Sequence, residues 1–101
     1  MALQAAFIFL APKADAAKHR ATVHTADVDL TVVGVANYAE AESAARALVK
    51  DGTTAIELCG GFGALGTARI QQAVAGKAAI GVVRFDGHPG LGGKSGDTIF
   101  G

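Results

Sequence analysis

Four mostly apolar runs constrain the fold of this 101-residue chain more than any other feature. They cover Ala5–Leu10, Leu30–Val35, Thr53–Leu58 and Ala79–Phe85. None of them alternates cleanly between apolar and polar residues, as a strand does when one face of its sheet is in water. Each run is instead typical of a strand that is buried on both faces, and such strands belong mainly to parallel sheets with helices packed on them.

Helical patterns separate these runs. The clearest covers residues 38–51 and begins after Asn37, which is a favourable N-cap. A second helix is expected over about residues 64–75, where apolar residues recur on one side. A third is expected over about residues 16–23, with Asp15 as its cap. The chain therefore reads as alternating strands and helices, in the order β-α-β-α-β-α-β.

This order predicts an α/β fold with a four-stranded, mostly parallel sheet. The expected strand order is 2-1-3-4, which is that of a flavodoxin-like or Rossmann-like half. Right-handed crossovers then place the first helix on one face and the other two helices on the opposite face. One short helix is too small to cover four apolar strands. We therefore expect a homo-oligomer, most simply a dimer, in which another subunit or the C-terminal tail hides the remaining surface.

Length and composition bound the class of protein. A chain of 101 residues predicts a single domain, residues 1–101, with one modest core. The formal net charge is zero, which argues against a nucleic-acid-binding surface. The run Ala5–Ala11 is too short to span a bilayer and lacks the basic segment of a secretory signal. A single cysteine excludes an internal disulfide and favours a cytoplasmic protein.

The last sixteen residues, 86–101, differ from the rest. They contain six glycines and one proline, so we expect a turn-rich tail. A mobile terminus is one interpretation. The apolar pair Ile99 and Phe100 at its end favours the other, in which the tail docks on the surface of its own or a neighbouring subunit.

Ligands of open parallel sheets bind beyond the carboxyl ends of the strands, near the point where the strand order switches. Here that point lies between the first and third predicted strands. The expected binding residues follow the first, third and fourth strands and are mostly glycine or polar: Pro12, Gly60, Gly61, Phe62, Gly63, Arg84 and Asp86. A small anionic molecule is the ligand that this set favours.

The glycine loop 60–63 suggests how such an anion is held. Glycines let a ligand approach the backbone, and the next helix offers free N–H groups at its start. The stretch 61–66 matches G-x-G-x-x-G, with Asp86 twenty residues later. The motif follows the third strand, and the chain is too short for two mononucleotide halves, so no dinucleotide cofactor is expected. A tight turn with no ligand is the alternative to a carboxylate or phosphate site.

Three residues near this loop are candidates for catalysis. Cys59 precedes a helix N-terminus, which favours a thiolate, although a free cysteine is also a common buried apolar residue. Glu57 lies two residues back on the same face and is either a general base or the ion-pair partner of Arg84. Arg84 is otherwise a clamp for a substrate carboxylate. His88 is either a proton shuttle or an exposed turn residue.

A metal site is not expected. Glu57, Cys59, Asp86 and His88 are metal-ligand types, but their spacing matches no zinc motif.

Several blocks resemble a known family. They are FIFLAP, KHR, VGV, IELCGGFG, GVVRFD and HPGL, and together they span nearly the whole chain. They are similar to a short bacterial family catalogued as a domain of unknown function, DUF6506, and IELCGGFG is the most specific of them. The resemblance implies a small bacterial α/β protein of about this length and brings no catalytic residues with it.

Two classes of function follow. The first is an enzyme such as an isomerase or lyase, which moves a proton through Cys59 or Glu57 on a carboxylate-bearing substrate while His88 assists. The second is a ligand-binding or structural subunit without chemistry, in which Glu57 pairs with Arg84 and Cys59 is inert. The reactivity of the single thiol distinguishes them.

Overall fold

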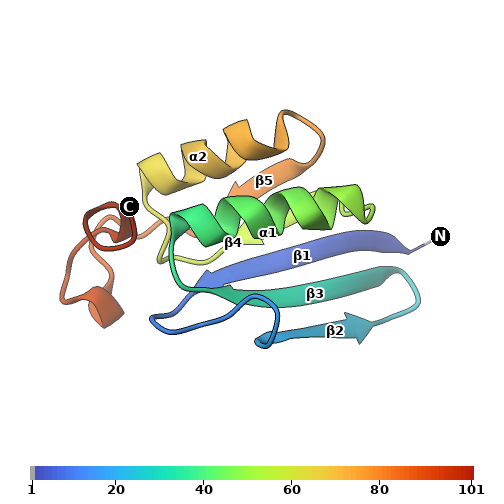
Figure 1. Cartoon of the computed structure of the whole chain (residues 1–101), viewed down its shortest axis with the longest axis horizontal. Coiled ribbons are helices and arrows are strands. Elements are labelled where there is room, and N and C mark those ends of the chain that lie inside the picture. Colours follow the sequence, from blue (N-terminus) through green and yellow to red (C-terminus); the bar gives the residue numbers. More distant parts are fainter. Residues whose placement is uncertain (1) are drawn as a thin grey trace.

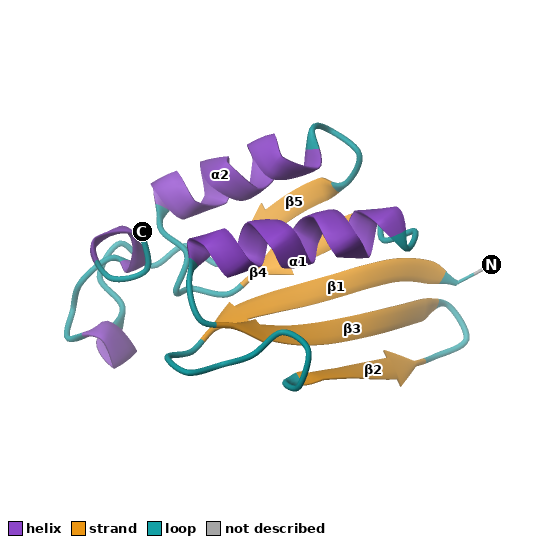
Figure 2. Cartoon of the chain, viewed as in Figure 1, coloured by secondary structure: helices purple, strands orange, loops and turns teal. Residues whose placement is uncertain are grey.

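Residues 2–101 fold into one sheet of five strands with two helices packed on it. A computed structural model describes residues 2–101 (Figure 1). The strands and helices are β1 (Leu3–Leu10), β2 (Arg20–His24), β3 (Val28–Val35), α1 (Tyr38–Lys50), β4 (Ala55–Leu58), α2 (Ala64–Val74) and β5 (Ala79–Val82). The strand order is β2-β3-β1-β4-β5. All neighbours are parallel except β2 and β3 (Figure 2).

The α/β class and the mostly parallel sheet are confirmed, but the prediction of four strands was wrong. The four predicted strands lie side by side as β3-β1-β4-β5, and β2 adds an antiparallel strand at the edge. This strand takes up residues 20–23, the second half of the segment 16–23 that was predicted as a helix. Asp15 caps only a turn, where its Oδ1 accepts a hydrogen bond from the Ala17 N–H at 2.8 Å. The Thr25 hydroxyl then closes the hairpin by donating to the Val28 carbonyl at 2.7 Å.

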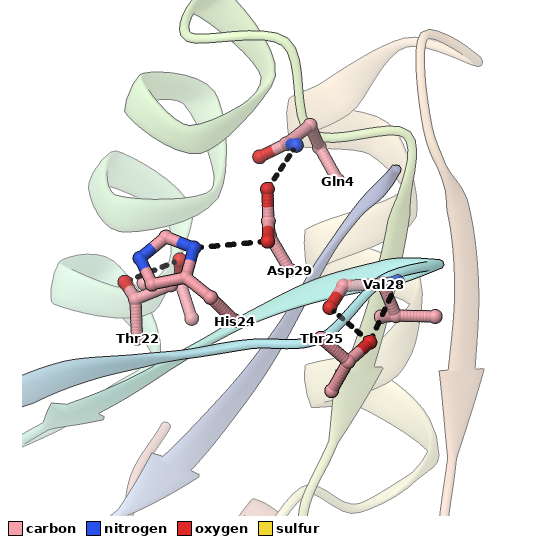
Figure 3. A network of polar contacts seen from close by, with 7 residues as sticks. Gln4, Thr22, His24, Thr25, Val28 and Asp29 are labelled. Carbon is pink, nitrogen blue, oxygen red and sulfur yellow. Dashed lines mark hydrogen bonds and ion pairs between the residues drawn. The ribbon is translucent and has the colours of Figure 1, made fainter. Parts of the chain in front are cut away.

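Side chains between neighbouring strands explain why this segment is extended (Figure 3). The hydroxyls of Thr22 and Thr31 lie 3.0 Å apart across β2 and β3. Asp29 accepts from the Gln4 amide at 2.8 Å and contacts His24 Nδ1 at 2.9 Å. The bond from Gln4, followed by that from His24, lowers the pKa of Asp29. Cross-strand pairs of this kind outweigh the helical preference of a short alanine-containing segment.

Both other helices form where the sequence predicts them. Asn37 Oδ1 accepts from the Glu40 N–H at 2.9 Å, and Glu40 reaches back to the Ala36 N–H at 3.2 Å, which closes the start of α1. Glu42 binds Arg69 of α2 through two hydrogen bonds of 3.1 and 3.2 Å. These bonds are the main cause of the lowered pKa of Glu42. The ion pair joins the two helices side by side.

Both helices lie on the same face of the sheet (Figure 1). The core lies between the helices and the sheet. Buried residues of the three middle strands and of both helices form it, among them Ile8, Val33, Tyr38, Leu48, Leu58 and Ile70. The predicted helix on the other face does not form, because its segment became β2. Among residues 2–101, neither helix is long and apolar enough to cross a membrane.

We call the face opposite the helices the open face. Strand alternation and the register place on it Leu3, Ala5, Phe7, Phe9, Ala21, Val23, Val28, Leu30, Val32, Gly34, Ala55, Glu57, Ala79 and Gly81. These residues are nearly all apolar. The predicted homo-oligomer stays a prediction.

The C-terminal tail packs on its own chain. It forms two short 3-10 turns, η1 (Pro89–Leu91) and η2 (Gly96–Thr98), beyond the carboxyl ends of the parallel strands (Figure 1). Phe100 is buried, and its ring centroid lies 6.4 Å from that of Tyr38. The Tyr38 N–H donates to the Phe100 carbonyl at 3.2 Å. The tail therefore forms one wall of the region where a ligand was expected.

Candidate functional site

A pocket lies at the carboxyl ends of β1 and β4, the switch point of the sheet. Its volume is about 260 Å³. The sheet side contributes Leu10, Ala11, Pro12, Cys59 and Gly61, and the tail contributes His88, Gly90, Leu91 and Phe100. Four of the predicted site residues, Pro12, Cys59, Gly61 and His88, thus line one cavity. The tail supplies the other wall, so the pocket exists only when the tail is docked.

Cys59 lies at the floor of this pocket and is partly exposed. Its Sγ accepts hydrogen bonds from the Leu10 N–H and from the Gly61 N–H, both at 3.3 Å. The Cys59 N–H itself continues the sheet by donating to the Ile8 carbonyl at 3.0 Å. Two converging backbone donors thus hold the sulfur of a residue that lines the cavity.

His88 enters the pocket from the turn that precedes η1. Its Nδ1 accepts from the Gly90 N–H at 2.9 Å. A neutral ring with this bond carries its proton on Nε2, which makes that atom a donor. The ring also lies 4.6 Å from the ring of Phe85, centroid to centroid. The imidazole is therefore held on two sides, and within residues 2–101 its Nε2 has no hydrogen-bond partner.

The glycine loop has a different neighbour from the one expected. A Cβ on Gly63 would collide with the Asp97 carboxylate, and a Cβ on Gly96 of the tail would collide with the Gly61 carbonyl oxygen. A Cβ on Gly60 would collide with the Phe85 ring, which follows β5. The loop therefore lacks side chains at Gly60 and Gly63 because Phe85 and the tail pack against it.

Asp97 occupies the start of α2, where a ligand anion was expected. Its carboxylate accepts from the Leu65 N–H at 3.1 Å, the Gly66 N–H at 3.0 Å and the Tyr38 hydroxyl at 2.8 Å. Burial opposes its ionisation, but these three hydrogen bonds outweigh burial and lower the pKa of Asp97. An intramolecular carboxylate thus satisfies the helix N-terminus.

Tyr38 connects the tail to the glycine loop. Its hydroxyl donates to Asp97 and accepts from the Gly63 N–H at 2.9 Å. Its ring stacks on Phe62 at 5.5 Å, and the Arg69 guanidinium lies 5.5 Å from its centroid. Burial, followed by the Asp97 carboxylate, raises the pKa of Tyr38 to about 12, although the Gly63 N–H opposes this shift.

The raised pKa of Tyr38 predicts a loss of stability in strong alkali. Below about pH 10, the ordinary tyrosine pKa, the phenol is neutral in both the folded and the unfolded chain. Its full contribution to the free energy of unfolding is then present. Between about pH 10 and about 12 the unfolded chain loses this proton first, so the free energy of unfolding falls. Urea unfolding monitored by circular dichroism checks this. The decline should be shallower in Tyr38→Phe, and equal slopes in both proteins would contradict the assignment.

Other predicted site residues lie outside the pocket. Glu57 is exposed on the open face, so it does not meet the cavity. Arg84 pairs with Asp86 at 2.9 Å rather than with Glu57, and both side chains are more than 70% exposed. This bond is the main cause of the raised pKa of Arg84. Phe62 is buried against Tyr38.

A separate groove of about 230 Å³ runs between α2 and β5 and includes Phe62, Gly63 and Arg84. The predicted site is thus divided. Cys59 and His88 belong to the switch-point pocket, whereas Arg84 belongs to this groove.

Sequence reasoning missed two residues that shape the site. Asp97 and Tyr38 are 59 positions apart, and their hydrogen bond depends on how the tail folds back. Ser95 before Gly96 offered one local signal, because its hydroxyl caps η2 by accepting from the Asp97 N–H at 3.2 Å. No local pattern links Asp97 to the start of α2.

A protein-family model matches residues 3–98, and it describes a family of unknown function, DUF6506. The match confirms the resemblance carried by the sequence blocks. No curated protein and no solved structure matches the chain. The residues of the pocket are therefore interpreted from their own geometry.

Proposed function

Because this chain belongs to the DUF6506 family, whose function is unknown, we propose its function from the switch-point pocket: it binds a small carboxylate-bearing molecule and acts on it through Cys59 and His88. One observation carries the proposal. The only thiol of the chain and a fixed imidazole line the same cavity at the sheet position where α/β proteins bind ligands.

The size and lining of the pocket limit the ligand. A volume of about 260 Å³ lies below the usual range for drug-sized ligands, so the molecule is small. The lining contains no lysine or arginine, which disfavours a doubly charged phosphate. An apolar portion of the ligand packs against Leu10, Leu91 and Phe100. His88 Nε2–H is the donor available to a carboxylate or carbonyl oxygen.

The chemistry proposed is proton transfer. Cys59 Sγ is held by two backbone N–H groups, which also stabilise negative charge on the atom that they contact. A sulfur in this setting removes a proton from a carbon next to a carbonyl and returns it, while His88 neutralises the oxygen on which charge develops. An isomerase or lyase requires these two roles. Glu57 has no part, since it lies on the open face.

One observation favours a second function, that of a ligand-binding subunit without catalysis. The two bonds to Cys59 Sγ tie the end of β1 to the glycine loop, which is a structural role in itself. In that case the thiol is inert and the pocket binds its ligand unchanged.

Alkylation of Cys59 by iodoacetate and by iodoacetamide tests the proposal. In each reaction sulfur displaces iodide from carbon, and only iodoacetate carries a carboxylate. At neutral pH we expect the rate ratio of iodoacetate to iodoacetamide to be about fivefold higher in the folded chain than in urea, because His88 Nε2–H donates to the carboxylate of iodoacetate. That ratio corresponds to about 1 kcal/mol, the net contribution of a typical hydrogen bond.

Two variants are the controls. His88→Asn keeps an acceptor for the Gly90 N–H but removes the imidazole, so the ratio should return to that of the unfolded chain. His24→Ala alters an exposed histidine at the far edge of the sheet and should leave the ratio unchanged. A folded chain whose Cys59 resists both reagents would support the structural role, and equal ratios in the folded and unfolded chains would exclude a carboxylate site.

A further inference from the structure

The open face is a large apolar surface that the chain leaves uncovered. Five strands about 4.8 Å apart, of up to eight residues each, give it an area of roughly 500 Å². Leu3 and Val23 on it are 46% and 57% exposed. This area is comparable to the largest apolar patch of a typical monomer, and such patches are often functional. Two such faces packed together bury roughly 1,000 Å², the lower limit for a specific interface.

We propose that a second copy of this chain covers the open face, in a two-fold dimer whose axis runs parallel to the strands between β1 and β3. The strand order suits this symmetry, because the axis places β1 opposite β3 of the second copy and β2 opposite β4. Sheets packed face to face lie about 10 Å apart with their strands nearly aligned. Every contact then occurs twice, as an isologous interface requires.

The apolar residues of the open face complement their own copies. Within one chain, Ala5 is level with Leu30 and Phe7 with Val32. The proposed axis preserves these levels, so Ala5 of one copy faces Leu30 of the other and Phe7 faces Val32. A large side chain thus lies opposite a smaller one at both levels. Such pairing lets two layers interdigitate.

The ionisable side chains on this side of the sheet are also complementary. Glu57 is exposed and, among residues 2–101, has no hydrogen-bond or ion-pair partner. His19, directly before β2, lines a hollow on the open face with Phe9 and Val32. Its Nδ1 accepts from the Asp15 N–H at 2.9 Å, so the neutral ring carries its proton on Nε2. One residue offers only acceptors and the other offers a donor.

The proposed axis brings these two side chains together. It places Glu57 of β4 level with Ala21 of the second copy, because both are level with the Phe7–Val32 pair. His19 is two residues further along, about 6.6 Å away. The long glutamate side chain and the imidazole span this offset. His19 Nε2–H then donates to the Glu57 carboxylate of the other copy, once on each side of the axis.

Light scattering of the purified chain tests the dimer directly. We expect a mass twice the 10.1 kDa of one chain. Glu57→Lys should raise the dissociation constant about tenfold or more, because it removes the carboxylate acceptor and sets an ammonium donor against the His19 Nε2–H donor. The exchange of both partners, Glu57→Lys with His19→Glu, should recover most of that loss. Glu57 is exposed, so these variants are expected to fold.

The matched control lies on the helix side. Leu65 is 68% exposed on α2, and Leu65→Lys should leave the dimer intact. A mass of a single chain for the wild-type protein would overturn the proposal. So would a dimer that survives Glu57→Lys but dissociates in Leu65→Lys, because the helix side would then be the interface. Failure of the double variant to recover association would exclude the pairing of Glu57 with His19.

Discussion

Phe100→Ala should destabilise the protein by about 3–5 kcal/mol, the usual cost of removing a buried phenylalanine ring. The ring is 93% buried at the end of the tail, where it contacts Tyr38 and lines the switch-point pocket. Its loss leaves a cavity between the tail and α1 and removes one wall of the pocket. Urea unfolding measures the stability, and the alkylation ratio of Cys59 should fall to that of the unfolded chain.

The neighbouring residue is the control for this substitution. Ile99 is also apolar but is 47% exposed, so Ile99→Ala should cost well under about 1 kcal/mol. The large difference expected between two adjacent apolar residues depends on the tail being docked. Equal and small effects of both substitutions would mean that the tail is free in solution.

Asp97→Ala should cost about 2–3 kcal/mol, because it removes the acceptor for three hydrogen bonds at once. The Tyr38 hydroxyl is left without its acceptor inside the structure, and two N–H groups at the start of α2 lose theirs. The lowered pKa of Asp97 adds a pH dependence. The contribution of this carboxylate to the free energy of unfolding is present above the ordinary aspartate pKa of about 4. It is lost as the pH falls through the lower pKa that Asp97 has in the folded chain.

Two further variants separate this effect from a general loss of charge. Asp97→Asn keeps one acceptor oxygen and should cost about 1 kcal/mol less than Asp97→Ala. Asp86→Ala removes a carboxylate that is 80% exposed in the same tail and should change stability by less than about 0.5 kcal/mol. If Asp97→Ala were as mild as Asp86→Ala, the carboxylate would not hold the tail.

The predicted and observed folds differ mainly at residues 16–24. Asp15 as a cap predicted a helix there, but only one turn formed, in which its side chain accepts from the Ala17 N–H and its carbonyl accepts from the N–H groups of Lys18 and His19. The strand depends on partners that are distant in sequence, such as Asp29 and Thr31. Since cross-strand pairing is not visible in local propensity, this error has a physical cause. The protein therefore has two layers, the sheet and one layer of helices, rather than the predicted three. The missing helix leaves the open face uncovered.

The rule that ligands bind at the carboxyl ends of parallel strands located the candidate site, and one residue, Asp97, changed its interpretation. Parallel strands deliver Pro12 and Cys59 to the same rim, so their proximity followed from the strand order. The glycine loop was predicted to bind an external anion. It receives Asp97 instead, because the tail folds back over it. Glycine spacing indicates that another group approaches the backbone closely, but it does not identify that group.

The sequence by itself determined the α/β class, the two helices with their ends and the sheet rim at which the pocket lies. Those features depend on local patterns, namely apolar runs, an N-cap and the order of strands and helices along the chain. The tertiary structure alone decided the conformation of β2, the docking of Asp97 and Phe100, and the separation of Glu57 from Cys59 and of Arg84 from His88. The conformation of β2 and the docking of Asp97 and Phe100 depend on contacts between segments distant in the chain, and no single stretch of sequence contains both halves of such a contact. The two separations depend on which face of the sheet or which cavity each side chain meets, and that is set by the packing of the whole chain.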